Sequence, residues 1–147
     1  MDKLDYLKLV KILMKQKKMG GNKHMEEIIA NIDLEEIKTI AKQKLRYMGV
    51  KVHFLGFKYW TTAIYTIIDT EFNNEQELRM MELYYIVAKK HKTTASKVER
   101  AMRYAYKDID LKKYFNVSYS VNNTALLFLL KEAVMSKYVS DKNVPQI

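Results

Sequence analysis

The stretch "KKHKTTASKVERAMRYAYK", residues 89–107, predicts an amphipathic helix over about 94–107 that two threonines precede. At about 100° per residue, small and apolar side chains share one arc of this helix. They are Ala95, Val98, Ala101, Met102 and Ala105. Polar side chains occupy the opposite arc, namely Ser96, Lys97, Glu99, Arg100, Arg103, Tyr104 and Lys107. The small inner residues would let this helix lie close to its neighbours and leave its outer arc standing away from the body.

A second helix is expected directly before this one, over 73–92, with an Asn cap and acidic residues at its start. Its expected buried stripe is Leu78, Met81, Tyr85 and Ala88. Ala88 supplies the small residue that a crossing helix needs, and Val98 faces back towards it. Lys92 occupies the turn, where Gly or Asn is more usual because both tolerate positive φ. The pair therefore has the pattern of a helix-turn-helix.

The outer arc of the helix over 94–107 carries chemistry that suits DNA. Arg can donate two hydrogen bonds to guanine, Glu can accept one from cytosine, and Ser and Lys suit phosphates or base edges. Thr94 can cap the helix, whose first amides can receive a phosphate. Any amphipathic surface helix carries charges, however, and Glu99 with Arg103 forms a favourable i,i+4 pair. The pattern alone leaves DNA contact and a solvated face evenly matched.

The remaining segments predict an all-α fold. Gly (4) and Pro (1) are scarce, which disfavours the many tight turns of a β protein. Helices are expected at 3–19, 24–32, 33–49 (Asp33 cap, Gly49 end), 57–72, 108–115 and 124–138 (Asn123 or Thr124 cap), with an extended linker at 50–57. The buried side of 57–72 should hold Trp60, Ala63, Ile64, Ile67 and Ile68. We expect a compact multi-helix bundle containing the helix-turn-helix at 35–147, and a helical N-terminal extension at 1–34.

Composition excludes several classes of function. Net charge is +9 with a pI near 9.5, which favours a polyanionic partner. The absence of Cys excludes disulfides, thiolate nucleophiles and Cys-ligated metals. His24, His53 and His91 are widely spaced, and no phosphate-binding Gly-rich loop or nucleophile motif occurs. The longest apolar run, 125–130, is too short to span a bilayer, and no signal peptide is evident. We expect a cytoplasmic protein that is not an enzyme and takes no cofactor or metal.

Two blocks of sequence resemble a known family. "AKKHKTTASKVERAMRYA" and "LRYMGVKVHFLGFKYWTTAI" are similar to the C-terminal DNA-binding effector domain of the sporulation master regulator (stage-zero sporulation protein A) family. The resemblance covers roughly residues 35–138. It implies a helical bundle that binds promoter elements as tandem copies and activates or represses transcription. It places Ser96, Glu99, Arg100 and Arg103 at DNA-contacting positions, whereas Lys92, Lys97 and Tyr104 stand where the family has Asn, Arg and His.

The resemblance also marks two differences from the full regulator. Residues 1–34 are too few for the receiver domain that precedes the effector domain there. We therefore expect no phosphorylation control, and the helix at 3–19 would act as the dimerisation element. The segment "DIDLKKYFNVSYS" departs from the region that helps contact the sigma subunit of RNA polymerase in the family.

We expect a sequence-specific regulator of transcription that binds double-stranded DNA as a homodimer or as tandem copies, with the sigma subunit as a further partner. The expected DNA-binding residues are Thr94, Ser96, Lys97, Glu99, Arg100, Arg103, Tyr104 and Lys107. An alternative is an antagonist or modulator that pairs with a related regulator through residues 1–34. A third, disfavoured alternative is attachment of the helix at 3–19 to a membrane surface.

Overall fold

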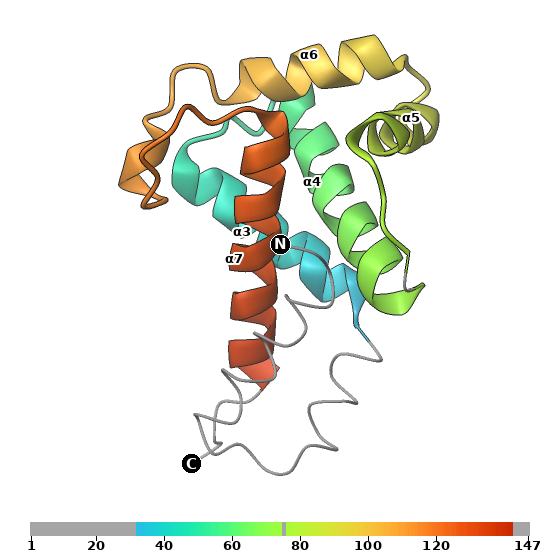
Figure 1. Ribbon diagram of the computed structural model, residues 1–147, viewed down its shortest axis with the longest axis vertical. Coiled ribbons are helices and arrows are strands. Elements are labelled where there is room, and N and C mark those ends of the chain that lie inside the picture. Colours follow the sequence, from blue (N-terminus) through green and yellow to red (C-terminus); the bar gives the residue numbers. More distant parts are fainter. Residues whose placement is uncertain (1–31, 75, 143–147) are drawn as a thin grey trace.

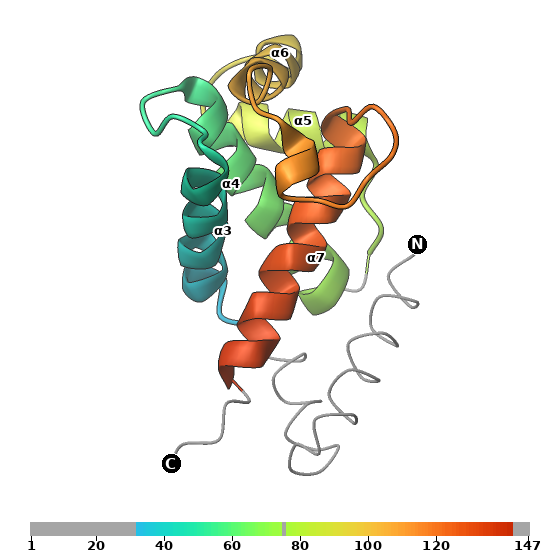
Figure 2. The same cartoon turned by 90° about the vertical axis from the view of Figure 1, so that its left-hand side faces the viewer.

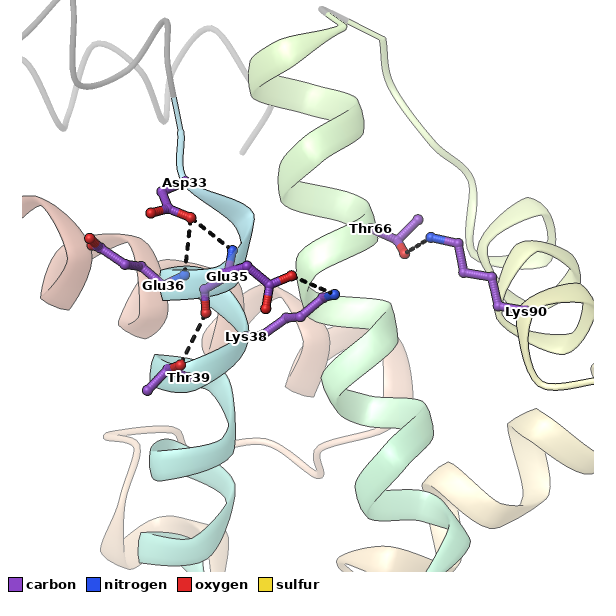
Figure 3. A network of polar contacts seen from close by, with 7 residues as sticks. All are labelled: Asp33, Glu35, Glu36, Lys38, Thr39, Thr66 and Lys90. Atoms are coloured by element: carbon purple, nitrogen blue, oxygen red, sulfur yellow. Dashed lines mark hydrogen bonds and ion pairs between the residues drawn. The ribbon is translucent and has the colours of Figure 1, made fainter.

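The computed structural model describes residues 32–74 and 76–142. The first helix in this part of the chain begins at a side-chain cap. The backbone amides of Glu35 and Glu36 donate to the Asp33 carboxylate at 3.0 and 3.4 Å (Figure 3). This cap opens α3 (Leu34–Met48), which ends at Gly49 with φ of +94°. Such a left-handed residue favours glycine, because a Cβ would strain it. The helix predicted over 33–49 and both of its boundaries are confirmed.

The next helix, α4 (Leu55–Ile68), is the central element of the bundle. It buries eleven of its fourteen residues, including all five that were predicted for its core side. This burial on nearly every side overrides the weak helix propensity of its Thr and Ile residues. The expected boundaries were wrong at both ends. The helix begins at Leu55, inside the predicted linker, and residues 69–73 form a π-helical turn, η1 (Asp69–Asn73).

The first helix of the pair, α5 (Met80–Lys90), begins seven residues later than predicted. Asn73 does not cap it, because its side-chain amide donates instead to the Asp69 carboxylate within η1 at 2.8 Å. The predicted stripe was wrong at two of its four positions. Met81 and Tyr85 are 61% and 64% exposed. The buried residues of α5 are Leu83, Tyr84, Val87 and Ala88, so that Ala88 alone of the predicted stripe is fully buried and Leu78 lies half-buried before the helix.

The second helix of the pair is α6 (Ala95–Ala105), and the last helix is α7 (Asn123–Lys142). Between them, the helix predicted at 108–115 is reduced to one 3-10 turn, η2 (Leu111–Lys113). The cap of α7 was predicted one or two residues too late, because the Asn122 carboxamide accepts from the amide of Ala125 at 2.9 Å. The helix also continues past residue 138, where it was predicted to end.

The described helices form an all-helical bundle with no strand among residues 32–74 and 76–142. Figure 1 shows α6 lying across one end of α4 and α7, and Figure 2 shows α3, α4 and α7 beneath it from a second direction. Trp60 of α4 is completely buried at the centre of the core. The predicted fold class is confirmed, and the bundle presents one helix across its end.

Some expectations fall outside the described residues. The helix predicted at 3–19 lies wholly there, as does nearly all of the one at 24–32, so the division at residue 34 stays a prediction. Within the described part, no helix has the length and apolar character that crossing a membrane requires.

Candidate nucleic-acid interface

The inner side of α6 is fitted closely to the start of α4. Val98, Met102 and Ala105 are buried there. Gly56 packs so tightly against α6 that a Cβ at this position would collide with the Ala101 carbonyl oxygen and lie 2.6 Å from the Ala105 Cβ. The small residues predicted for the inner arc therefore let α6 lie close to its neighbour, as expected. They allow two helices to approach almost backbone to backbone, which fixes how far α6 stands from the core.

Trp60 fixes the axial position of α6. Its indole Nε1 donates to the Met102 carbonyl oxygen at 2.8 Å, and both residues are completely buried. Because an indole N–H left unpaired in the core would cost a hydrogen bond, sliding α6 along α4 is unfavourable.

A buried polar cluster secures the other flank of α6. The Asn123 side chain, at the start of α7, accepts from the Tyr106 hydroxyl at 2.8 Å. Its amide donates to the Tyr84 hydroxyl at 3.1 Å and to the Glu99 carbonyl oxygen at 3.2 Å. Asn123 therefore connects α5, α6 and the turn after α6 through one side chain that is 6% exposed.

Burial governs the acid–base behaviour of this cluster. It raises the pKa of Tyr106 to about 12, with a further contribution from the neighbouring Tyr84. Burial also raises the pKa of the Tyr84 hydroxyl, which the hydrogen bond from Asn123 partly offsets. Both hydroxyls are protonated at neutral pH, so the cluster is a set of neutral hydrogen bonds and not a catalytic group.

The predicted DNA-binding residues lie together on and around the outer side of α6. Ser96, Lys97, Arg100, Arg103 and Tyr104 are exposed, and Glu99 is half-buried. The Arg103 guanidinium makes a two-pronged ion pair with Glu99, with Nε 3.1 Å from Oε1 and Nη2 3.3 Å from Oε2. Arg100 has no ion pair with any described residue. The two arginines thus differ: Glu99 orients the Arg103 guanidinium, whereas Arg100 has no ion-pair partner among the described residues.

The remaining two predicted residues lie at the two ends of α6. Thr94 is the N-cap, and its hydroxyl accepts from the Lys97 amide at 3.3 Å. Lys107 lies in the turn that follows the helix, with its ammonium 4.4 Å from the Tyr104 ring centroid. The predicted span of 94–107 is therefore α6 with its cap and its closing turn. That these residues contact DNA stays a prediction.

The turn between α5 and α6 contains the strain that the sequence implied. Lys92 has φ of +55°, a left-handed conformation that costs a residue with a Cβ about 1–2 kcal/mol. His91 packs beside the turn, with its Nε2 2.7 Å from the Thr62 hydroxyl and its ring 5.1 Å from that of Tyr59. Burial lowers the pKa of His91, and the charges of Lys58 and Lys90 lower it further.

Sequence reasoning missed a groove beside α6, which we name the α6 groove. It has a volume of about 620 Å³ and lies between residues 53–56 and the helix. Tyr104 stands at its edge, 5.5 Å from the Phe54 ring. Sequence reasoning also missed the Asn123 cluster, because its members are 17 to 39 residues apart and share no pattern. The one available signal was an Asn at the expected start of α7, which we interpreted as a cap.

Comparison with known proteins supplies the identity. The family described as "Sporulation initiation factor Spo0A C terminal" matches residues 41–125, which is more than half of the chain. No solved structure matches. The match includes α4, α5 and α6 in full and stops just inside α7. The chain therefore belongs to the Spo0A C-terminal family, a DNA-binding transcription effector domain and not an enzyme.

Proposed function

We propose that this protein is a sequence-specific regulator of transcription that inserts α6 into the major groove of double-stranded DNA. The observation that carries the proposal is the contrast between the two sides of α6. Its inner side is fixed by Gly56, Trp60 and Asn123, while its outer side presents only polar and aromatic side chains. A helix that contacts base edges needs this combination, because its side chains must be held in register with the bases.

The outer side chains suggest a division of roles. Arg100 is exposed and has no ion pair among the described residues, so it is available to donate two hydrogen bonds to a guanine. The ion pair with Glu99 orients the Arg103 guanidinium before DNA arrives. Lys97 and Lys107 suit phosphates, as does the Thr94 end of the helix. Ser96 and Tyr104 complete the proposed set of contacts.

Other parts of the proposal rest on family membership alone. Binding to tandem or paired sites, as a homodimer or as successive copies, is one of them. Contact with the sigma subunit of RNA polymerase is another, and a location on the nucleoid follows from DNA binding. The alternative of an antagonist acting through residues 1–34 concerns residues that lie almost wholly outside the described ones, and it stays a prediction.

Selection of bound duplexes from a random pool tests the proposal. The full chain should enrich a defined sequence, and Arg100→Ala should lose about 1–3 kcal/mol of discrimination, or about 5- to 150-fold, at one position. Lys137→Ala is the matched control. It removes one cation from an exposed site on α7, where Lys137 pairs with Asp141.

The control variant should keep the preference of the wild-type protein. Enrichment of no sequence by the wild-type chain would contradict the proposal and would favour the antagonist alternative. An unchanged preference in Arg100→Ala would contradict the role of that residue.

A further inference from the structure

A second groove, which we name the α3–α4 groove, runs between those two helices and has a volume of about 380 Å³. Four cationic side chains line it, namely Lys38, Lys42, Arg46 and Lys58, together with His91, and no carboxylate does. The Lys90 ammonium lies beside it, 4.7 Å from the ring of Tyr65, and Lys38 lies 4.5 Å from the same ring. Figure 3 shows Lys38 and Lys90 reaching towards α4 from two sides.

The charge of this groove is largely uncompensated. Lys38 pairs with Glu35 at 3.2 Å, but Lys42, Arg46 and Lys58 have no ion pair with any residue in 32–74 or 76–142. Like charges four residues apart on a helix repel one another, so this arrangement is unfavourable for the isolated chain. Burial is the main cause of the lowered pKa of His91, and the charges of Lys58 and Lys90 beside this groove lower it further. The groove therefore suits an anionic occupant.

The spacing of the cations suits a chain of negative charges. Lys38, Lys42 and Arg46 recur every four residues on α3, so they extend over about 12 Å along its axis. One strand of B-DNA presents a phosphate about every 3.4 Å along the duplex axis, so about three phosphates face such a length. Residues 1–31 are a poor occupant by comparison, because they hold seven lysines and only four carboxylate side chains.

The α3–α4 groove also adjoins the proposed DNA-binding helix. His91 lines it, closes α5 and contacts the ring of Tyr59 at 5.1 Å. Tyr59 in turn lines the α6 groove, together with Thr93, Lys97 and Arg100. The Tyr59–His91 contact thus joins a residue that lines one groove to a residue that lines the other.

We propose that the α3–α4 groove binds the phosphate backbone of DNA that flanks the sequence contacted by α6. This inference rests on the proposed function, and it adds a contact that the helix-turn-helix does not supply. The flanking contact would strengthen binding without discriminating between sequences, because phosphates carry no base identity.

The test uses the double variant Lys42→Ala/Lys58→Ala of the full chain. Both side chains are exposed, and neither forms an ion pair or a side-chain hydrogen bond with another described residue. The matched control is Lys112→Ala/Lys137→Ala, which removes two exposed lysines from η2 and α7. Each protein is titrated between 50 and 200 mM salt with two duplexes. One holds only the selected site, and the other adds about 10 bp, one helical turn, on each side.

On the long duplex, log K should fall less steeply with log salt for the groove variant than for the wild-type protein. The slope should be smaller in magnitude by about 1.8, because each of the two lost phosphate contacts contributes about 0.9. Over the fourfold salt range, the wild-type affinity should then fall about 12-fold more than that of the variant. On the short duplex, the groove variant and the wild-type protein should agree. The base preference should not change on either duplex, and the control should follow the wild-type protein throughout.

Identical behaviour of the groove variant and the wild-type protein on the long duplex would overturn this inference and leave the groove to an acidic protein segment. An equal loss on both duplexes would also overturn it, because the contact would then lie within the selected site. Failure of the proposed function looks different, since the wild-type protein would select no sequence at all.

Discussion

The Asn123 cluster allows a sharp prediction about what holds α6 in place. In Asn123→Ala, the hydroxyls of Tyr84 and Tyr106 lose their hydrogen bonds to Asn123 while they stay buried. A buried polar group left without a partner costs about 1–3 kcal/mol. The Glu99 carbonyl oxygen loses one donor, but it belongs to a helix and its own ladder bond compensates in part. Two hydroxyls therefore give an expected loss of about 2–6 kcal/mol in the free energy of unfolding.

Urea unfolding followed by circular dichroism measures this loss, and the slope m should stay constant if the native fold is kept. Asn122→Ala is the control, because the neighbouring residue is the exposed cap of α7 and should cost only about 1 kcal/mol. Tyr106→Phe completes a double-mutant cycle, since it removes the hydroxyl that donates to the Asn123 Oδ1.

The cycle should show coupling, so that Asn123→Ala costs less in the Tyr106→Phe background than in the wild-type protein. Sequence-specific binding should also weaken in Asn123→Ala at temperatures well below its midpoint, because α6 loses the link to α7. A cost of less than 1 kcal/mol, or strictly additive single effects, would refute the role given to Asn123.

Further predictions concern pH, close packing and buried charge. The pKa of Tyr106 is raised from near 10 to about 12 in the folded state. The contribution of its protonated hydroxyl to the free energy of unfolding is therefore complete below pH 10 and is lost as the pH rises through 12. Urea unfolding at each pH measures the stability of the wild-type protein and of Tyr106→Phe. As the pH rises, the wild-type protein should lose up to about 3 kcal/mol of stability relative to the variant. Gly56→Ala should cost about 1–3 kcal/mol and lower DNA affinity, because its Cβ collides with the Ala101 carbonyl; full stability in urea would contradict this packing. Lys131→Ala should cost about 3–5 kcal/mol, because it leaves the buried Glu71 without the ammonium 2.9 Å away, whereas replacing both residues with apolar ones should restore most of the loss in thermal unfolding.

The sequence alone determined the features that depend on near neighbours. The cap at Asp33 and the end at Gly49 were predicted correctly, because both rest on hydrogen bonds within a few residues. The two arcs of α6 were predicted for the same reason, since helical periodicity places side chains without reference to the rest of the chain. The resemblance of two sequence blocks was enough to identify the family.

The tertiary structure alone decided which groups meet across the chain. The ion pair of Lys131 with Glu71 spans 60 residues, and the bond from Trp60 to the Met102 carbonyl spans 42. No local pattern encodes such pairs, because they depend on which helix faces come together. The start of α5 was mispredicted for a related reason: the π-helical turn after α4 engages Asn73, which therefore does not cap α5. Which side of α5 is buried depends on the helices packed against it, and local periodicity did not identify that side. Local hydrogen bonds thus set where α3 begins and ends, while packing set how α6 is held and which cations line the groove between α3 and α4.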